Sequence, residues 1–335
     1  MRSFGSDNHS GVHPEILNAI IEANKDHAIA YGGDTYTIKA TEVIKKHFGE
    51  TAEPFFVFNG TGANIVALRA CTNTFNSIIS SETAHIAVDE CGAPEFFTGA
   101  SLKEIATCDG KLTPELIKPL LIELGFEHHS QPKVVYISQC SELGTVYSVD
   151  EIKELACFLH SYNMYLHVDG ARLANAAVTL GKSLKEITAD CGVDILSFGG
   201  TKNGMMLGEV VIAFRPQLVE NMKYIRKQCA QLYSKMRFSS CQFIPYLENN
   251  IWLKNATNAN YMAQLLKEKI TQKGSFEFTQ KTEANILLLK MPKTMSEKLL
   301  KRHFFYFWNE AAGEIRLVTS WDTTEEDIDN FVKDI

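Results

Sequence analysis

The sequence lacks several patterns that would place the protein in a specialised class. Its eight cysteines form no CxxC pair, which argues against a zinc site or a thioredoxin motif and favours free thiols in a reducing cytoplasm. No run approaches the roughly 20 apolar residues of a membrane span, and residues 1–6 hold no apolar segment of signal-peptide length. We therefore expect a soluble, cytoplasmic protein without a membrane partner.

Charge and histidine spacing argue against two further classes of ligand. The 335 residues carry a net charge of -7, whereas binding to the phosphates of a nucleic acid requires a basic face. The ten histidines show no HExxH motif or comparable ligand spacing, so we expect no metal. With 45% hydrophobic and 22% charged residues, the chain has the composition of an ordinary globular protein.

Short apolar runs alternate with segments of helical periodicity over the first two thirds of the chain. The predicted strands are 55–58, 77–80, 133–138, 164–168, 195–198 and 209–214, and the predicted helices are 62–72, 114–124, 149–162 and 216–235. This alternation is typical of an α/β fold with a mostly parallel central sheet and helices on both faces. The strand 209–214 follows Lys202 too closely for a helical crossover, so we expect it to pair antiparallel.

The order of predicted helices and strands changes after about residue 240. A helix near 258–273 is followed by apolar runs at 284–290, 304–308 and 314–320, and by a final helix near 324–334. This pattern predicts a smaller α+β lobe. We therefore divide the chain into an N-terminal arm (1–14), a large domain (15–240) and a small C-terminal domain (241–335).

A lysine and an aspartate follow two of the predicted buried strands. Lys202 lies in Ser197-Phe198-Gly199-Gly200-Thr201-Lys202-Asn203-Gly204, where small neighbours leave room for a flat ring. Asp169 ends the run 164–168, and ligands bind outside the carboxyl ends of parallel strands. This pair indicates pyridoxal 5'-phosphate (PLP), with Lys202 holding the cofactor as a Schiff base and Asp169 keeping its ring nitrogen protonated. A turn or helix-capping aspartate is the structural alternative.

Three further segments carry residue types suited to a phosphate, a ring and a carboxylate. Gly60 and Thr61 lie in a strand-to-helix turn, where exposed N–H groups attract an anion, although many glycine turns bind none. His85 follows a predicted strand and can stack on a ring and exchange protons near neutral pH. Arg172 and Arg316 each offer a guanidinium to a carboxylate. The alternatives are a surface arginine at position 172 and a structural salt bridge at position 316.

The order of these residues along the chain resembles that in the threonine aldolases, which are PLP enzymes of fold type I. The resemblance covers essentially the whole chain and is closest to the bacterial low-specificity L-threonine aldolases. Its motifs are Ser6-Asp7-Asn8, Thr83-Ala84-His85, Asp89-Glu90-Cys91-Gly92-Ala93-Pro94-Glu95-Phe96-Phe97, Phe198-Gly199-Gly200-Thr201-Lys202-Asn203-Gly204 and Ser320-Trp321-Asp322-Thr323. Many relatives carry a tyrosine four residues after the histidine, where this chain has Asp89, so no role of that tyrosine is carried over.

The resemblance implies roles for the residues expected around the cofactor. Lys202 matches the lysine that binds PLP, His85 the ring-stacking histidine, and Asp169 the partner of the ring nitrogen. Gly60 and Thr61 match the turn that binds the phosphate.

The resemblance also implies contacts to the substrate and between subunits. Ser6, Arg172 and Arg316 match contacts to the substrate carboxylate and to cofactor oxygens. His128 falls where the family has a histidine near the substrate hydroxyl. Tyr31 matches an N-terminal tyrosine–glycine segment that reaches a neighbouring subunit's site. Sites of this fold type usually lie between subunits, so the resemblance implies at least a homodimer and, by family analogy, a homotetramer.

The activity implied by the resemblance is reversible cleavage of L-threonine or L-allo-threonine, and of related β-hydroxy-α-amino acids, to glycine and an aldehyde. The base for the β-hydroxyl proton is His85, His128 or a bound water, and the sequence does not choose among them. The rival hypotheses are another PLP reaction on the same scaffold, such as β-elimination or cleavage of phenylserine, and a non-catalytic homologue. The presence of both Lys202 and Asp169 argues against a non-catalytic homologue.

Overall fold

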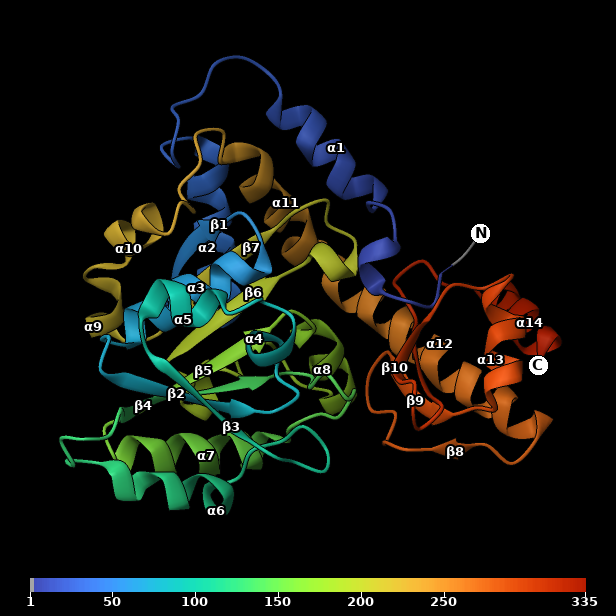
Figure 1. The fold of residues 1–335 in the computed structure, drawn as a ribbon. Coiled ribbons are helices and arrows are strands. Elements are labelled where there is room, and N and C mark those ends of the chain that lie inside the picture. Colours follow the sequence, from blue (N-terminus) through green and yellow to red (C-terminus); the bar gives the residue numbers. More distant parts are fainter. Residues whose placement is uncertain (1–2) are drawn as a thin grey trace.

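The computed structural model describes residues 3–335; residues 1–2, the start of the predicted arm, lie outside the described residues. Figure 1 shows a large lobe built around one sheet and a smaller lobe formed by the C-terminal part of the chain. The long helix α12 (Ile251–Lys273) runs from the first lobe into the second. Helix α11 (Arg237–Glu248) packs against α1 (Pro14–Ala23) and α2 (Thr35–Phe48) of the large lobe. The domain boundaries given above stay a prediction.

A seven-stranded sheet organises the large lobe, with the strand order β1-β7-β6-β5-β4-β2-β3. Neighbouring strands from β6 to β3 are parallel, and β7 is antiparallel to both β6 and β1. The predicted mostly parallel sheet and its antiparallel strand are therefore confirmed. The strands are β1 Glu53–Val57, β2 Asn76–Ser81, β3 Ser101–Ile105, β4 Gln131–Ser138, β5 Tyr165–Gly170, β6 Ile195–Gly199 and β7 Glu209–Ala213.

Strand β3 is absent from the strands predicted above. It is an edge strand whose side chains are all exposed or half-buried. Its sequence, Ser-Leu-Lys-Glu-Ile, therefore lacks the continuous apolar run that marks a strand buried on both faces.

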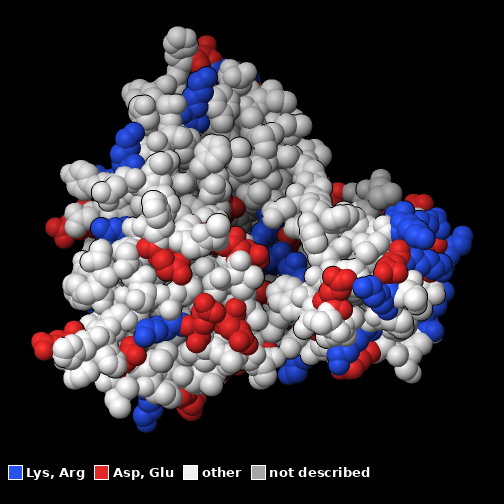
Figure 2. Space-filling view, in the orientation of Figure 1, with Lys and Arg blue, Asp and Glu red and all other residues white. Residues whose placement is uncertain are grey.

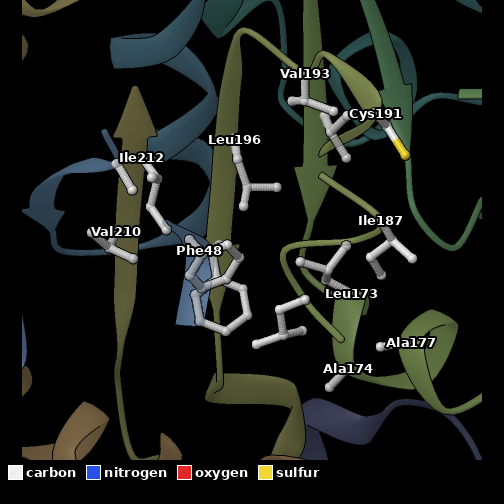
Figure 3. Close-up of a cluster of buried hydrophobic side chains, with 14 of the residues drawn as sticks. Phe48, Leu173, Ala174, Ala177, Ile187, Cys191, Val193, Leu196, Val210 and Ile212 are labelled. Atoms are coloured by element: carbon white, nitrogen blue, oxygen red, sulfur yellow. The ribbon is translucent and has the colours of Figure 1, made fainter. Parts of the chain in front are cut away.

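Helices cover both faces of the sheet, as predicted. Successive side chains of a strand point to opposite faces. Leu196 of β6 packs in the same cluster as Phe48 of α2, and Figure 3 shows the two side chains close together. The neighbouring Ile195 belongs to a second cluster with Val66 of α3 (Gly60–Cys71) on the other face. This double burial explains why the central strands are apolar throughout.

Two predicted helices are interrupted. The segment 114–124 begins as α6 and continues as a 3-10 helix, because Pro119 has no N–H for an α-helical hydrogen bond. The segment 216–235 divides into α9 and α10 and ends at Gln228. The large-lobe helices are α1 Pro14–Ala23, α2 Thr35–Phe48, α3 Gly60–Cys71, α4 His85–Val88, α5 Ala93–Thr98, α6 Pro114–Ile117, α7 Val149–Ser161, α8 Leu173–Leu180, α9 Pro216–Val219, α10 Met222–Gln228 and α11.

The small lobe is an antiparallel four-stranded sheet packed against helices, which confirms the predicted α+β character. Its strand order is β10-β11-β9-β8. The strands are β8 Glu277–Phe278, β9 Ile286–Lys290, β10 Tyr306–Asn309 and β11 Glu314–Val318, and the helices are α13 Lys293–Leu300 and α14 Glu325–Asp334. The predicted helix near 258–273 starts earlier, because it is the second part of α12.

The start of the described chain packs against the small lobe before it enters the large one. Phe4 is buried in the small-lobe core, and its N–H donates to the carbonyl of Phe304. The chain then forms a 3-10 helix, Asp7–His9, on its way to α1. Within residues 3–335, none of the helices has both the length and the apolar character to cross a membrane.

Candidate active site

One cleft lies at the carboxyl ends of the parallel strands. Strands β1, β2, β4, β5 and β6 point in the same direction, so the segments that follow them meet at one edge of the sheet. Figure 2 shows a hollow between the lobes in which blue basic and red acidic side chains lie close together. The cleft is lined by Gly60, Asn64, His85, Ser138, Cys140, Glu142, Asp169, Ala171, Arg172 and Lys202.

Asp169 is held as a buried, ionised carboxylate at the end of β5. The Tyr136 hydroxyl and the Asn64 side-chain amide donate to Oδ2 at 2.6 and 2.9 Å, and the Ala171 N–H donates to Oδ1 at 2.9 Å. Burial alone raises the pKa of Asp169, but these hydrogen bonds and the charge of Lys202 outweigh it and lower the pKa. An anion here suits the protonated nitrogen of a heterocycle.

Lys202 is half-buried in a 3-10 helix just after β6. Burial, and then the positive charge of Arg172, lower the pKa of its ammonium group. A lowered pKa increases the fraction of neutral amine, which is the form that attacks an aldehyde. The preceding segment is sterically restricted, since a Cβ atom on Gly199 would lie 1.9 Å from Glu209 Oε2.

His85, the first residue of α4, is paired with a buried carboxylate. Its Nδ1 lies 2.8 Å from Oε1 of Glu90, and this hydrogen bond is the main cause of the raised pKa of His85. The side-chain amide of Asn64 donates to the same Glu90 oxygen at 2.9 Å as well as to Asp169. Asn64 therefore connects the histidine–glutamate pair to the aspartate.

The turn after β1 leaves space for an anion. The Asn59 side chain caps α3 by accepting a hydrogen bond from the Gly62 N–H at 2.7 Å. The first N–H groups of a helix have no partner inside it and attract negative charge. A Cβ atom placed on Gly60 would meet no atom within 4 Å, so the space in front of this helix end is open.

The two predicted arginines differ in their partners. Arg172 is held by the buried Asp7, with Nε to Oδ2 at 2.7 Å and Nη2 to Oδ1 at 2.9 Å. Arg316, on β11, has a buried Nε without a hydrogen-bond partner among residues 3–335. Burial, and then the charge of Arg172, lower the pKa of Arg316 to about 10. Ser6 lies beside Asp7, where its Oγ caps the short helix by accepting from the Asn8 N–H.

The structure places His128 and Tyr31 away from the cleft. His128 is exposed in the turn before β4, at the amino end of that strand, whereas the cleft lies at the carboxyl ends. Tyr31 is 55% exposed in the loop between α1 and α2. Neither side chain reaches the cleft of its own chain. Thr61 is half-buried next to Gly60 but does not line the cleft.

Several side chains in or beside the cleft are absent from the predicted site residues, among them Glu142 in its lining. Asp7 and Glu90 lie within quoted motifs, and Asn64 follows Thr61 by three residues, but the sequence did not indicate which residues they contact. Tyr136 lies inside an apolar strand, where its hydroxyl gave no signal. Their functional meaning depends on contacts across the fold, such as that of Tyr136 with Asp169.

The chain is similar to known proteins over most or all of its length. A model of the beta-eliminating lyases matches residues 3–292. The chain is 40% identical to the low specificity L-threonine aldolase of a Pseudomonas species over 335 residues, covering all of this chain and 97% of that protein. It is 26% identical over 304 residues to the low specificity L-threonine aldolase of Escherichia coli K12, covering 88% and 87% of the two chains.

Solved structures are also similar to this chain. A threonine aldolase of Leishmania major superposes with a TM-score of 0.94 at 30% identity, covering 99% of this chain and 98% of that one. An aspartate aminotransferase of Thermus thermophilus, at 15% identity and a TM-score of 0.72, covers 97% of this chain and 88% of its own and shares the fold.

Proposed function

The chain belongs to the beta-eliminating lyase family, and on this premise we propose that it is a PLP-dependent carbon–carbon lyase of the L-threonine aldolase type. It cleaves L-threonine and L-allo-threonine to glycine and acetaldehyde, and acts on related β-hydroxy-α-amino acids. The observation that carries the proposal is that Lys202, Asp169 and His85 line one cleft. Full-length similarity to L-threonine aldolases favours this reaction over β-elimination or a non-catalytic role.

The residues of the cleft fit the cofactor. The open N-terminal end of α3 at Gly60 suits the phosphate, the Asp169 carboxylate suits the ring nitrogen, and the Lys202 amine suits the aldehyde. His85 lines the same cleft and is the candidate for stacking on the ring. Bound PLP supplies the electron sink for the electron pair that bond cleavage leaves on the substrate Cα.

The arginines are the proposed contacts of the substrate carboxylate. Arg316 has an unpaired buried donor, and Arg172 is oriented by Asp7. Fixing the carboxylate would also fix the rotation of the substrate and so select the bond that breaks. Ser6, next to Asp7 in the sequence, remains a candidate contact.

We propose a homotetramer in the cytoplasm. Large apolar side chains are exposed on the large lobe, including Ile29 at 74% and Phe96 at 83%, and a second copy of the chain would cover them. Tyr31 and His128 lie outside the cleft of their own chain, so they would contribute only to the active site of a neighbouring copy. All eight cysteines are free thiols, which supports a reducing compartment. Light scattering of the purified protein tests the tetramer, and a monomer would contradict it.

The proposed activity is tested by adding PLP to the purified protein and assaying L-threonine, L-allo-threonine and L-phenylserine in parallel. We expect glycine together with acetaldehyde from the first two substrates. Formation of ammonia and 2-oxobutanoate from L-threonine would instead identify β-elimination. A colourless protein that takes up no PLP would identify a non-catalytic homologue.

A further inference from the structure

A second carboxyl group lies in the cleft beside His85, and none of the roles above uses it. Glu142 follows β4 by four residues and is half-buried where it lines the cleft. Its Oε1 accepts a hydrogen bond from the Ser138 hydroxyl at 2.6 Å and one from the backbone N–H of His85 at 2.9 Å. Two donors from different segments therefore fix the orientation of this carboxyl group.

The surroundings of Glu142 raise the pKa of its carboxyl group. Burial is the main cause of its raised pKa, and the like charge of Asp169 adds to it, while the bonds from Ser138 and His85 oppose the shift. The charges of Arg172 and Arg316 also act on this carboxyl group. Glu142 lines the same cleft as His85 and Arg172.

The other candidates for the base are less well suited. The raised pKa of His85, caused by Glu90, favours the imidazolium form, which has no lone pair to accept a proton. His128 lies outside the cleft of its own chain. Asp169 is committed to three hydrogen bonds at the end of β5.

We propose that Glu142 is the general base that takes the β-hydroxyl proton of the substrate. In cleavage, the O–H bond breaks and its proton passes to the Glu142 carboxylate. The O–H electron pair becomes the second C–O bond of the aldehyde, and the Cα–Cβ electron pair stays on Cα. In the reverse direction, the Glu142 carboxylic acid returns the proton to the oxygen. This inference rests on the proposed aldol cleavage.

The test compares two reactions of the PLP-loaded Glu142→Gln enzyme. Glutamine keeps an oxygen for both donors but is no base. We expect kcat for L-threonine cleavage to fall about 10²- to 10⁴-fold. Exchange of the glycine Cα proton with deuterated water involves no hydroxyl, so it should keep its wild-type rate, and the cofactor spectrum should be unchanged. Glu104→Gln, on the exposed edge of β3, is the matched control and should keep both activities.

Ser138→Ala gives a second measurement that keeps the carboxyl group. It removes a hydrogen bond that stabilises the ionised form, so the acidic limb of kcat/KM for L-threonine should move to higher pH. A Glu142→Gln enzyme with wild-type cleavage would overturn the proposal. Equal losses of cleavage and of glycine exchange would overturn it too, because they indicate a structural role. A wild-type enzyme that exchanges glycine but does not cleave L-threonine would refute the proposed function itself.

Discussion

The carboxylate of Asp7 and the guanidinium of Arg172 form a two-point ion pair between residues 165 positions apart in the sequence. Both side chains are buried, and the side-chain amide of Asn285 donates a further hydrogen bond to Asp7 at 3.0 Å. The pair connects the N-terminal segment to the start of α8, and Asn285 extends the connection to the small lobe. Asp7 therefore fixes the orientation of the Arg172 guanidinium and accepts two of its N–H hydrogen bonds.

Replacing Asp7 by alanine should destabilise the protein strongly. The change leaves a buried guanidinium without its counter-charge, which typically costs about 3–5 kcal/mol. Urea unfolding measures the loss. Asp329→Ala is the matched control, because Asp329 pairs with Lys269 at the surface and should cost less than about 1 kcal/mol. If the two variants lost equal free energy of unfolding, burial of the Asp7–Arg172 pair would contribute nothing extra to stability.

Replacing Lys202 by alanine should abolish the absorption band of lysine-bound PLP and reduce L-threonine cleavage to background. The reason is that the variant has no amine at this position to bond with the cofactor aldehyde. Absorption spectroscopy after addition of PLP measures the change. Lys153→Ala, an exposed lysine on α7, should keep the band and the activity. A band that persists in Lys202→Ala would assign the covalent link to another residue.

Replacing Arg316 by alanine should raise KM for L-threonine. The loss of a charge-assisted hydrogen bond of about 1.5–3 kcal/mol corresponds to roughly a 10- to 150-fold increase. Because the proposed contact of Arg316 is to the substrate carboxylate, the PLP spectrum should not change. Steady-state kinetics measure the effect, and Arg302→Ala, at an exposed arginine that pairs with Asp334, is the control. An unchanged KM would remove Arg316 from the substrate contacts.

Glu209 should make stability depend on pH. Burial raises its pKa from 4.5 to about 7, so its protonated form favours the folded state. This contribution is fully present below pH 4.5 and is lost as the pH rises through about 7, by an amount on the order of 3 kcal/mol. Glu209→Gln, which can still accept from the Thr201 hydroxyl, lacks this dependence.

The measurement is urea unfolding of both proteins from pH 4.5 to 8. The stability of Glu209→Gln relative to the wild type should increase across this range. Glu220→Gln, at an exposed glutamate, should follow the wild-type curve. Parallel curves for the wild type and Glu209→Gln would mean that Glu209 titrates at its ordinary pKa in the folded protein.

Much of the fold was predictable because its signals are local. Central strands such as β5 and β6 are buried on both faces and therefore appear as continuous apolar runs. The edge strand β3 has no such run and was missed. The break after α6 depends on a proline in the middle of an otherwise helical pattern, which gives a weaker signal than the pattern itself.

The sequence by itself determined which reactive groups follow which strands, and hence that Lys202 and Asp169 share an edge of the sheet. Only the tertiary structure decided the partners of each group. It pairs Arg172 with Asp7 and His85 with Glu90, and it puts His128 at the opposite end of β4. The physical reason is the distance along the sequence over which each kind of signal acts. Periodicity and turn residues act over a few positions, whereas an ion pair or a shifted pKa depends on which distant segments pack together.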